Sequence, residues 1–222
     1  MSVGRKPKQG ESQDIISFTP APVKILRDKE TLEILEDPAY YLIIKVLRKG
    51  PMTVRDLDEA YNRAAAEDKK YESKSDKTLY RYLKHLEKVD LVIPAGKRIA
   101  IGKTASETLF ARTAIVFMTH PETSEWWTSE AGMNTVERVA IGLEQLHGRK
   151  VSIPCLGNIL RNLESAKQSE IEALVSEGER SALESITSGD WDEVDKSLGL
   201  IKLLSVLLSK SEIIDELRTC LA

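Results

Sequence analysis

The chain has 222 residues, of which 41% are hydrophobic and 30% charged, an ordinary globular composition that provides enough apolar residues for a buried core. The net charge of −3, taken alone, argues against a nucleic-acid partner. That average hides a division, because residues 1–103 carry a net charge of +5 and residues 104–222 carry −8. The asymmetry predicts separate roles for the two parts of the chain.

Cysteine use and apolar runs narrow the class of protein further. The only cysteines, Cys155 and Cys220, stand far apart in no metal-like spacing, so we expect a cytoplasmic protein without a disulfide framework. The first residues have no apolar core, so we expect no signal peptide. The most apolar run, Leu198–Leu208, is too short for a membrane span and is interrupted by Lys202, so we expect no membrane partner.

The first predicted elements are three short helices. Residues 1–20 are polar and without period, which predicts a flexible tail. From Glu30 the pattern becomes helical, and an Asp-Pro pair at 37–38 stops one helix and starts the next. Gly and Pro at 50–51 end that second helix, and Thr53 is suited to cap a third. The third helix is open to extension into the polar segment 64–72.

The next predicted helix, 75–89, separates its residues by chemistry around its axis. Ser75 is one candidate cap, and Ser73 with Asp76 forms a loose capping-box pattern as the other. At roughly 100° per residue, four cations fall within an arc of about 60°; they are Lys77, Arg81, Lys84 and Lys88. Three leucines fall on the opposite side, which we expect to be buried; they are Leu79, Leu83 and Leu86.

A basic hairpin is predicted to follow this helix. Residues 91–93 and 98–101 are strand-like and are joined through Pro94, Ala95, Gly96 and Lys97. We therefore expect a wing over 92–101 with Lys97 and Arg98 at its tip. Asp90, just before the hairpin, tolerates a left-handed turn. The segment 104–118 is open between a strand and the start of a helix.

Taken together, these elements predict a mainly α protein with three parts. We expect the tail at 1–20, a winged helix-turn-helix domain at 21–103, and an all-α domain at 104–222. In the last part, helical patterns run over about 133–147, 152–188, 190–209 and 212–221, and the second is expected to break near Gly178. The apolar Leu198–Leu208 run requires cover either by the other helices of this part or by a second copy of the chain.

The basic face suits duplex DNA because lysine and arginine contacts to phosphates release counterions. A helix fits the major groove, where side chains near its N-terminus reach base edges and the others grip the backbone. The predicted base-reading residues are Ser75, Lys77, Thr78 and Arg81, with Arg81 suited to guanine. The predicted phosphate contacts on the helix are Tyr80, Lys84 and Lys88. On the wing, Lys97 and Arg98 are expected to reach a minor groove or flanking phosphates.

One reading competes with that interpretation. A basic helix face is often only a solvated face, and this explanation suffices for the arc taken alone. The agreement of the arc, the leucine stripe, the preceding helices and the basic hairpin favours DNA binding. Asp76 lies within the face and repels phosphate, unless it caps the helix or accepts a hydrogen bond from a cytosine amine.

Over residues 32–103 the sequence resembles the ArsR-type winged-helix transcriptional regulators, and within them an archaeal member. The resemblance is carried by the runs ILEDPAYYLIIKVLRKGPMTVRDL and SDKTLYRYLKHLEKVDLV and by the wing. It implies a dimeric DNA-binding repressor or activator. The thiolates of metal-sensing relatives are absent, because the corresponding segment here is Thr53-Val54-Arg55-Asp56-Leu57, so the resemblance implies no soft-metal site there.

Other candidate sites are weaker. Glu144 and His147 are spaced to share a helix face, but without further ligands a solvated pair explains them. Cys155 has no evident base partner and is expected to be an inert buried thiol. Four aromatic residues are open between an effector pocket and core packing; they are Phe110, Phe117, Trp126 and Trp127. We expect no catalytic residue, metal or cofactor, and therefore no enzyme.

The sequence therefore predicts a DNA-binding transcriptional regulator with recognition helix 75–89 and wing 92–101, acting as a homodimer through its C-terminal helices. Its partner would be double-stranded DNA, and the sequence does not identify an effector. The alternative is a winged-helix protein-interaction module in a larger transcription or RNA-processing assembly, without sequence-specific DNA binding.

Overall fold

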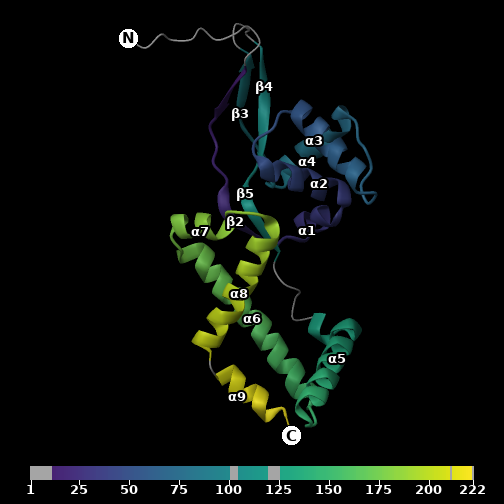
Figure 1. Ribbon diagram of the computed structural model, residues 1–222, viewed down its shortest axis with the longest axis vertical. Helices are drawn as coiled ribbons and strands as arrows, with labels where there is room; N and C mark the ends of the chain where they lie inside the picture. Colours follow the sequence, from purple (N-terminus) through teal and green to yellow (C-terminus); the bar gives the residue numbers. More distant parts are fainter. Residues whose placement is uncertain (1–11, 101–104, 120–125, 211, 222) are drawn as a thin grey trace. The chain divides into compact units, whose positions relative to one another are not determined.

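The computed structural model describes residues 12–100, 105–119, 126–210 and 212–221, and the protein is mainly α, as predicted. The chain forms two compact units, Met1–Thr119 and His120–Ala222, which are described separately below (Figure 1). The predicted boundary at 103/104 differs from the division between these units. The structural division lies at 119/120 instead, because the strands after residue 104 pair within the first unit.

The helices of the first unit follow the predicted order. They are α1 (Lys29–Glu36), α2 (Pro38–Val46), α3 (Val54–Glu67) and α4 (Asp76–Lys88), with a 3-10 turn η1 (Leu47–Lys49) after α2. Thr53 caps α3 in a full capping box with Asp56, and Ser75 rather than Ser73 caps α4. Gly50 ends η1 with a φ of +131°, a conformation that side chains rarely adopt, so the predicted Gly-Pro stop is confirmed.

The core of the first unit lies among these helices and one strand. Side chains from α2, α3 and α4, joined by Leu91 before β3, meet there and are almost completely buried, which is the expected result of one apolar face on each helix. The largest of them are Leu42, Ile43, Leu57, Tyr61, Leu79, Leu83, Leu86 and Leu91. Phe110 and Phe117 belong to or pack against the same core, so for these two aromatic residues core packing is confirmed.

Two small sheets complete the first unit. The antiparallel sheet has the order β1 (Ser12–Ile16), β3 (Val92–Ala100), β4 (Ser106–Arg112), and β2 (Ala21–Leu26) pairs in parallel with β5 (Ala114–Thr119). The segment after residue 104, which the sequence left open between strand and helix, therefore forms the strands β4 and β5. An isolated bridge links Met52, between η1 and α3, to Phe110 of β4 through two backbone hydrogen bonds of 2.9 and 2.7 Å.

The predicted hairpin turn at 94–97 is wrong. Pro94, Ala95 and Gly96 form a bulge within the continuous strand β3, and the hairpin is made by β3 and β4. Pro94 fits because β1 pairs only from Gly96 onward, so the missing N–H of proline is not required on that side. Lys97 and Arg98 therefore lie in the middle of a strand and not at a tip.

The predicted flexible tail is wrong in part. Residues 12–16 form β1 against β3, while residues 1–11 lie outside the described part of the chain. Gly96 permits this pairing, since a Cβ there would lie 2.1 Å from the carbonyl oxygen of Ile15. The close approach of two backbones explains why a residue without a side chain stands at this point.

The regular secondary structure of the second unit is helical in the residues that are described, apart from one isolated β-bridge. Its helices are α5 (Glu130–His147), α6 (Ile153–Glu177), α7 (Arg180–Thr187), α8 (Trp191–Ser209) and α9 (Glu212–Thr219), preceded by the 3-10 turn η2 (Trp126–Thr128). The expected break near Gly178 is confirmed. In the described residues no helix has both the length and the apolarity needed to cross a membrane.

The expectation of no disulfide is wrong. Cys155, at the start of α6, is bonded to Cys220, just after α9, with a Cα–Cα distance of 5.6 Å. The two segments are also joined by a hydrogen bond of 3.0 Å from the Ser152 N–H to the Cys220 carbonyl and by a bridge between Val151 and Leu221. The spacing of the two cysteines in the sequence did not reveal this disulfide, because they meet only when the chain has folded and α6 lies beside α9. The cytoplasmic location, which rested partly on free cysteines, stays a prediction.

Candidate nucleic-acid interface

Helix α4 is anchored on one side only. Leu79, Leu83 and Leu86 are 0% exposed, which confirms the leucine stripe predicted for this helix. The anchoring continues at its edge, where the Tyr40 hydroxyl and His85 Nδ1 are 2.8 Å apart and the rings of Tyr40 and Tyr82 lie 4.6 Å apart. This packing against α2 and α3 fixes the direction in which the opposite side of α4 faces solvent.

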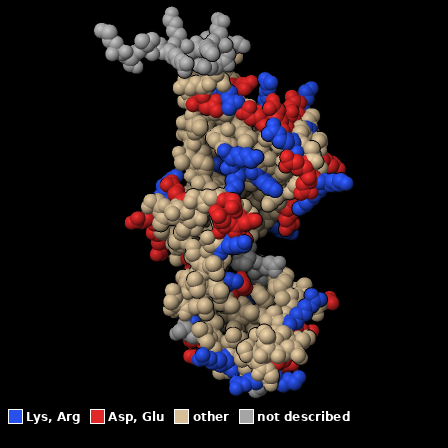
Figure 2. All heavy atoms as spheres, in the orientation of Figure 1, with Lys and Arg blue, Asp and Glu red and all other residues tan. Residues whose placement is uncertain are grey.

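The opposite side of α4 presents the four predicted cations. The side chains of Lys77, Arg81, Lys84 and Lys88 are all exposed, and the helix is strongly amphipathic. The visible face of the first unit is nevertheless mixed in charge, because Figure 2 shows blue Lys and Arg groups there alternating with red Asp and Glu groups. On α4 itself, Glu87 pairs with Lys84 and Asp76 lies in the first turn, so the cations of this helix have acidic neighbours.

Lys84 is the cation most engaged with the protein. Its Nζ donates to Glu87 Oε2 at 2.7 Å, and it lies 5.8 Å from the ring centroid of Tyr80 and 5.7 Å from that of Phe110. The hydrogen bond to Glu87 raises the pKa of Lys84, so its charge is secure. The same bond means that Lys84 must be released, at least in part, before it can bind a phosphate.

The N-terminal hydroxyls of α4 are also engaged. Ser75 Oγ accepts from the Thr78 N–H at 3.3 Å as the helix cap, and the two hydroxyl oxygens are 3.1 Å apart. Asp76 Oδ1 accepts from the Lys77 N–H at 2.6 Å, so this carboxylate also serves the helix start. The predicted base-reading roles of Ser75 and Thr78 would therefore compete with capping.

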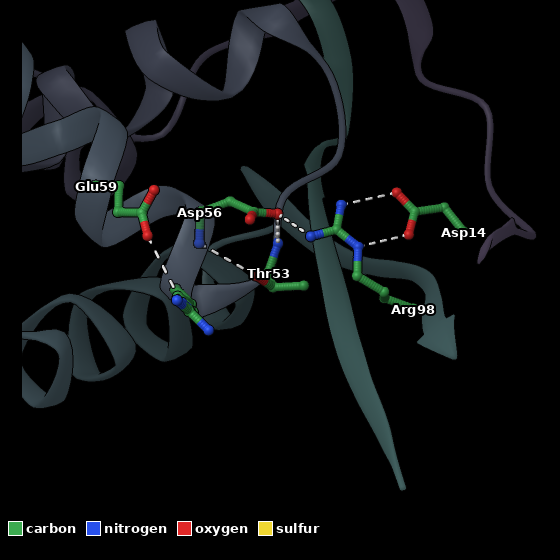
Figure 3. Close-up of polar contacts among 6 residues, drawn as sticks. Asp14, Thr53, Asp56, Glu59 and Arg98 are labelled. Atoms are coloured by element: carbon green, nitrogen blue, oxygen red, sulfur yellow. Dashed lines mark hydrogen bonds and ion pairs between the residues drawn. The ribbon is translucent and has the colours of Figure 1, made fainter. Parts of the chain in front are cut away.

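Arg98 is held inside a network that joins three elements (Figure 3). Its Nε and Nη2 donate to the two carboxylate oxygens of Asp14 at 2.7 and 2.9 Å, and its Nη1 donates to Asp56 at 2.6 Å. The Asp56 carboxylate also accepts from the Thr53 N–H at the cap of α3. The hydrogen bond to Asp14 raises the pKa of Arg98.

This network corrects the predicted role of Arg98. A guanidinium that spends its donors on two carboxylates has little left for DNA, and its function is to tie β1 and β3 to the start of α3. Lys97, its neighbour, remains exposed and pairs across the strands with Ile15 and Thr108. No sequence signal pointed to Asp14 or Asp56 as partners, because they are distant along the chain.

A groove lies beside α4, between it, the start of α3 and the β3–β4 hairpin. Its volume is about 930 Å³. Residues of both charges and two aromatic rings line it, including Asp58, Lys74, Tyr80, Lys84, Glu107 and Phe110. Asn62 holds the loop before α4 in place, since its side chain both donates to and accepts from the backbone of Lys74 at 2.9 Å. The groove thus has a fixed wall and a mixed charge.

The weaker candidate sites receive structural explanations. Glu144 accepts from the Val151 N–H at 3.0 Å and from Lys150 at 3.3 Å, and the backbone hydrogen bond lowers its pKa. This carboxylate therefore closes the turn after α5. Trp126 and Trp127 pack edge to face with ring centroids 4.9 Å apart. Among the described residues, no three histidine, cysteine or acidic side chains gather as a metal site would require.

Comparison with known proteins adds no family assignment. No protein-family model matches the chain, and no curated protein matches it. The resemblance to ArsR-type regulators therefore stays a prediction from the sequence runs that carry it.

Proposed function

We propose that this protein is a DNA-binding transcriptional regulator that places α4 in the major groove of a duplex. One observation carries the proposal: α4 buries three leucines completely and exposes four cations on the opposite side. A helix held in this way can approach phosphates without losing its packing, and the release of counterions would supply most of the affinity.

The order of elements supports a winged-helix interpretation. Helix α2, the Met52 bridge, α3, α4 and the β3–β4 hairpin follow one another, with the bridge adding a backbone link to β4. In this interpretation α4 is the recognition helix and the hairpin is the wing. The wing is then longer than the sequence indicated, with Arg98 engaged by Asp14 and Asp56 and Lys97 exposed.

The proposed contacts divide by position on α4. Lys77 and Arg81, toward the N-terminal half, would reach base edges, with Arg81 suited to bidentate recognition of guanine. Lys88 and Lys84 would contact phosphates, the latter after leaving Glu87. Lys97 and Tyr80 remain candidates for flanking phosphates because both are exposed. Arg98 is not part of this proposal.

Homodimer formation through the C-terminal helices is also a proposal. On α8 the buried residues are Val194, Leu198 and Val206, whereas Leu200, Leu204 and Leu208 are 57%, 53% and 86% exposed. These three exposed leucines lie four residues apart, so they share one helix face. A second copy covering this face would explain it, and a two-fold dimer would predict a palindromic site.

Binding of a labelled duplex of random sequence, measured by fluorescence anisotropy at several salt concentrations, tests the proposal. The logarithm of affinity should fall linearly with the logarithm of salt concentration, with a slope of about −0.9 per phosphate contact. Lys88→Ala should reduce the magnitude of the slope by about 1. Lys45→Ala, which removes an exposed lysine of α2, is the matched control and should leave the slope unchanged. An affinity independent of salt would contradict the proposal.

Sequence reading is tested separately from phosphate contact. Duplexes selected from a randomised pool should be bound more tightly than random duplex, and Arg81→Ala should lose about 1–3 kcal/mol of discrimination at one base pair. An equal loss of affinity for every duplex would remove Arg81 from the base-reading role and leave it as a phosphate contact.

The alternative, a winged-helix module that binds protein, is favoured by one feature. Asp76 and Glu87 lie on or beside the basic side of α4 and reduce its positive potential, which suits a partner of mixed charge better than a polyanion. If the affinity for duplex DNA did not depend on salt concentration, protein binding would become the favoured function.

A further inference from the structure

Arg112, at the end of β4, is a buried cation to which the described residues offer no acidic partner. The residue is only 7% exposed, and its Nε–H has no hydrogen-bond acceptor in the described part of the chain. No carboxylate of those residues forms an ion pair with it. Buried guanidinium groups are normally paired, because an uncompensated charge in the interior is costly. The position therefore calls for a counterion.

The surroundings of Arg112 orient it without neutralising it. The centre of its guanidinium lies 4.8 Å from the ring centroid of Phe117 on β5, so one face of the group is stacked on an aromatic ring. Stacking leaves the N–H groups at the edge available to an acceptor in the guanidinium plane. Arg48 of η1 is close enough to interact electrostatically, and burial together with Arg48 lowers the pKa of Arg112 to about 10.

Both arginines line one small cavity. It lies between η1, the β4–β5 junction and the segment before β2, and its volume is about 70 Å³. That volume exceeds what a single water molecule needs and suits a compact ion. Apart from the two arginines, the lining is glycine and apolar residues, namely Pro20, Leu47, Gly50, Pro51, Ala111, Ala114 and Ile115.

We propose that this cavity binds a small oxyanion, a phosphate or a short carboxylate, which accepts hydrogen bonds from the edge of the Arg112 guanidinium. The planar fork of an arginine matches the two oxygens of such a group, and the nearby charge of Arg48 strengthens the attraction. The site lies apart from the cations of α4 and does not depend on the proposed DNA binding. A bound anion would link η1 to β4 and so stabilise the first unit.

Thermal unfolding and equilibrium dialysis of the full chain test this site. Phosphate and acetate are compared with chloride at equal ionic strength, so that charge screening is the same in each titration. For the wild type we expect a saturable rise in Tm with phosphate or acetate beyond that with chloride, and the more effective of the two identifies the phosphate or the carboxylate group as the ligand.

Two variants assign the effect to Arg112. Arg112→Met keeps the length of the side chain but removes its charge, so it should raise the Tm in anion-free buffer and abolish the response to the oxyanion. Arg112→Lys should weaken binding of the oxyanion by about tenfold or more, because lysine lacks the planar, paired N–H donors of a guanidinium. Lys49→Met, an exposed neighbour in η1, is the charge-matched control and should respond as the wild type does.

Three results would overturn the site. They are an equal effect of chloride, a wild-type response in Arg112→Met, and dialysis that finds neither phosphate nor acetate bound to the wild type. The dialysis result decides the matter even if Arg112→Met does not fold. A loss of Tm in folded Arg112→Met with no anion response in the wild type would show a purely structural role.

Discussion

At the scale of single residues, the ability of a lysine or arginine to bind an anion depends on the groups that it contacts as much as on its charge. Lys77 and Arg81 are exposed on α4, Lys84 donates to Glu87, and Arg98 is shared between two carboxylates. Arg112 is buried against an aromatic ring. These five residues have the same formal charge, but the surface cations Lys77 and Arg81 are open to DNA phosphates, Lys84 and Arg98 are engaged by carboxylates, and Arg112 faces a small cavity.

The contact between Lys84 and Glu87 leads to a gain-of-binding prediction. Glu87→Gln removes the negative charge that holds Lys84, so the lysine becomes free to bind a phosphate. The variant should bind random duplex more tightly at a given salt concentration, with a salt slope close to that of the wild type, because Lys84 contacts a phosphate in both proteins. Glu33→Gln on α1 also frees a lysine, Lys29, but away from α4, and it is the control. Unchanged binding by Glu87→Gln would place Lys84 outside the interface.

The contact between Asp14 and Arg98 predicts a response to acid. The hydrogen bond from Arg98 lowers the pKa of Asp14 from 3.8, so the stabilisation of β1 is complete above that value and is lost as the pH falls through the lowered pKa. Amide hydrogen exchange should show β1 protected at about pH 5 and opening more often at about pH 3, after correction for intrinsic rates. Asp14→Asn should show no such change, and an equal change in both proteins would contradict this account.

At the scale of elements, β3 shows how pairing overrides a local signal. Pro94, Ala95 and Gly96 have the composition of a turn, but the strand continues through them as a bulge because β4 and β1 supply backbone partners beyond it. The approach of β1 to Gly96 leaves no room for a side chain. Long-range pairing thus decides between turn and strand at these residues.

The start of α4 provides a matched test of helix capping. Ser75 accepts the Thr78 N–H, whereas Ser73 is exposed and outside the helix. Ser75→Ala should therefore cost about 1 kcal/mol of local stability, and Ser73→Ala should stay within about 0.5 kcal/mol of the wild type. Hydrogen exchange of the α4 amides measures both. Equal effects of the two substitutions would show that Ser75 is not the cap.

At the scale of the whole molecule, the protein consists of two units with different means of stabilisation. The first unit packs helices against short strands around an apolar core. The second is an assembly of helices with smaller cores and a disulfide that joins the start of α6 to the end of α9. A change in redox conditions should therefore act on one unit and leave the other intact.

Reduction of the disulfide should destabilise the second unit selectively. The cysteines are separated by 65 residues, for which the chain-entropy relation gives a stabilisation of about 4 kcal/mol. In limited proteolysis at rising temperature, a reductant should lower the temperature at which residues 120–222 are cleaved. The first unit should stay resistant, because both cysteines lie in the second unit. The double variant Cys155→Ala, Cys220→Ala should not respond to reductant. Two free thiols in protein purified without reductant would contradict the prediction.

The sequence alone determined the features that depend on neighbours along the chain. Helix order, the leucine stripe of α4, its basic arc, the cap at Thr53 and the break at Gly178 all follow from spacing and local hydrogen bonding. Only the tertiary structure decided the strand pairing, the partners of Arg98, the burial of Arg112 and the bond between Cys155 and Cys220. The physical reason is that these features join residues far apart in the chain, and the free energy of each contact depends on what folding brings beside it.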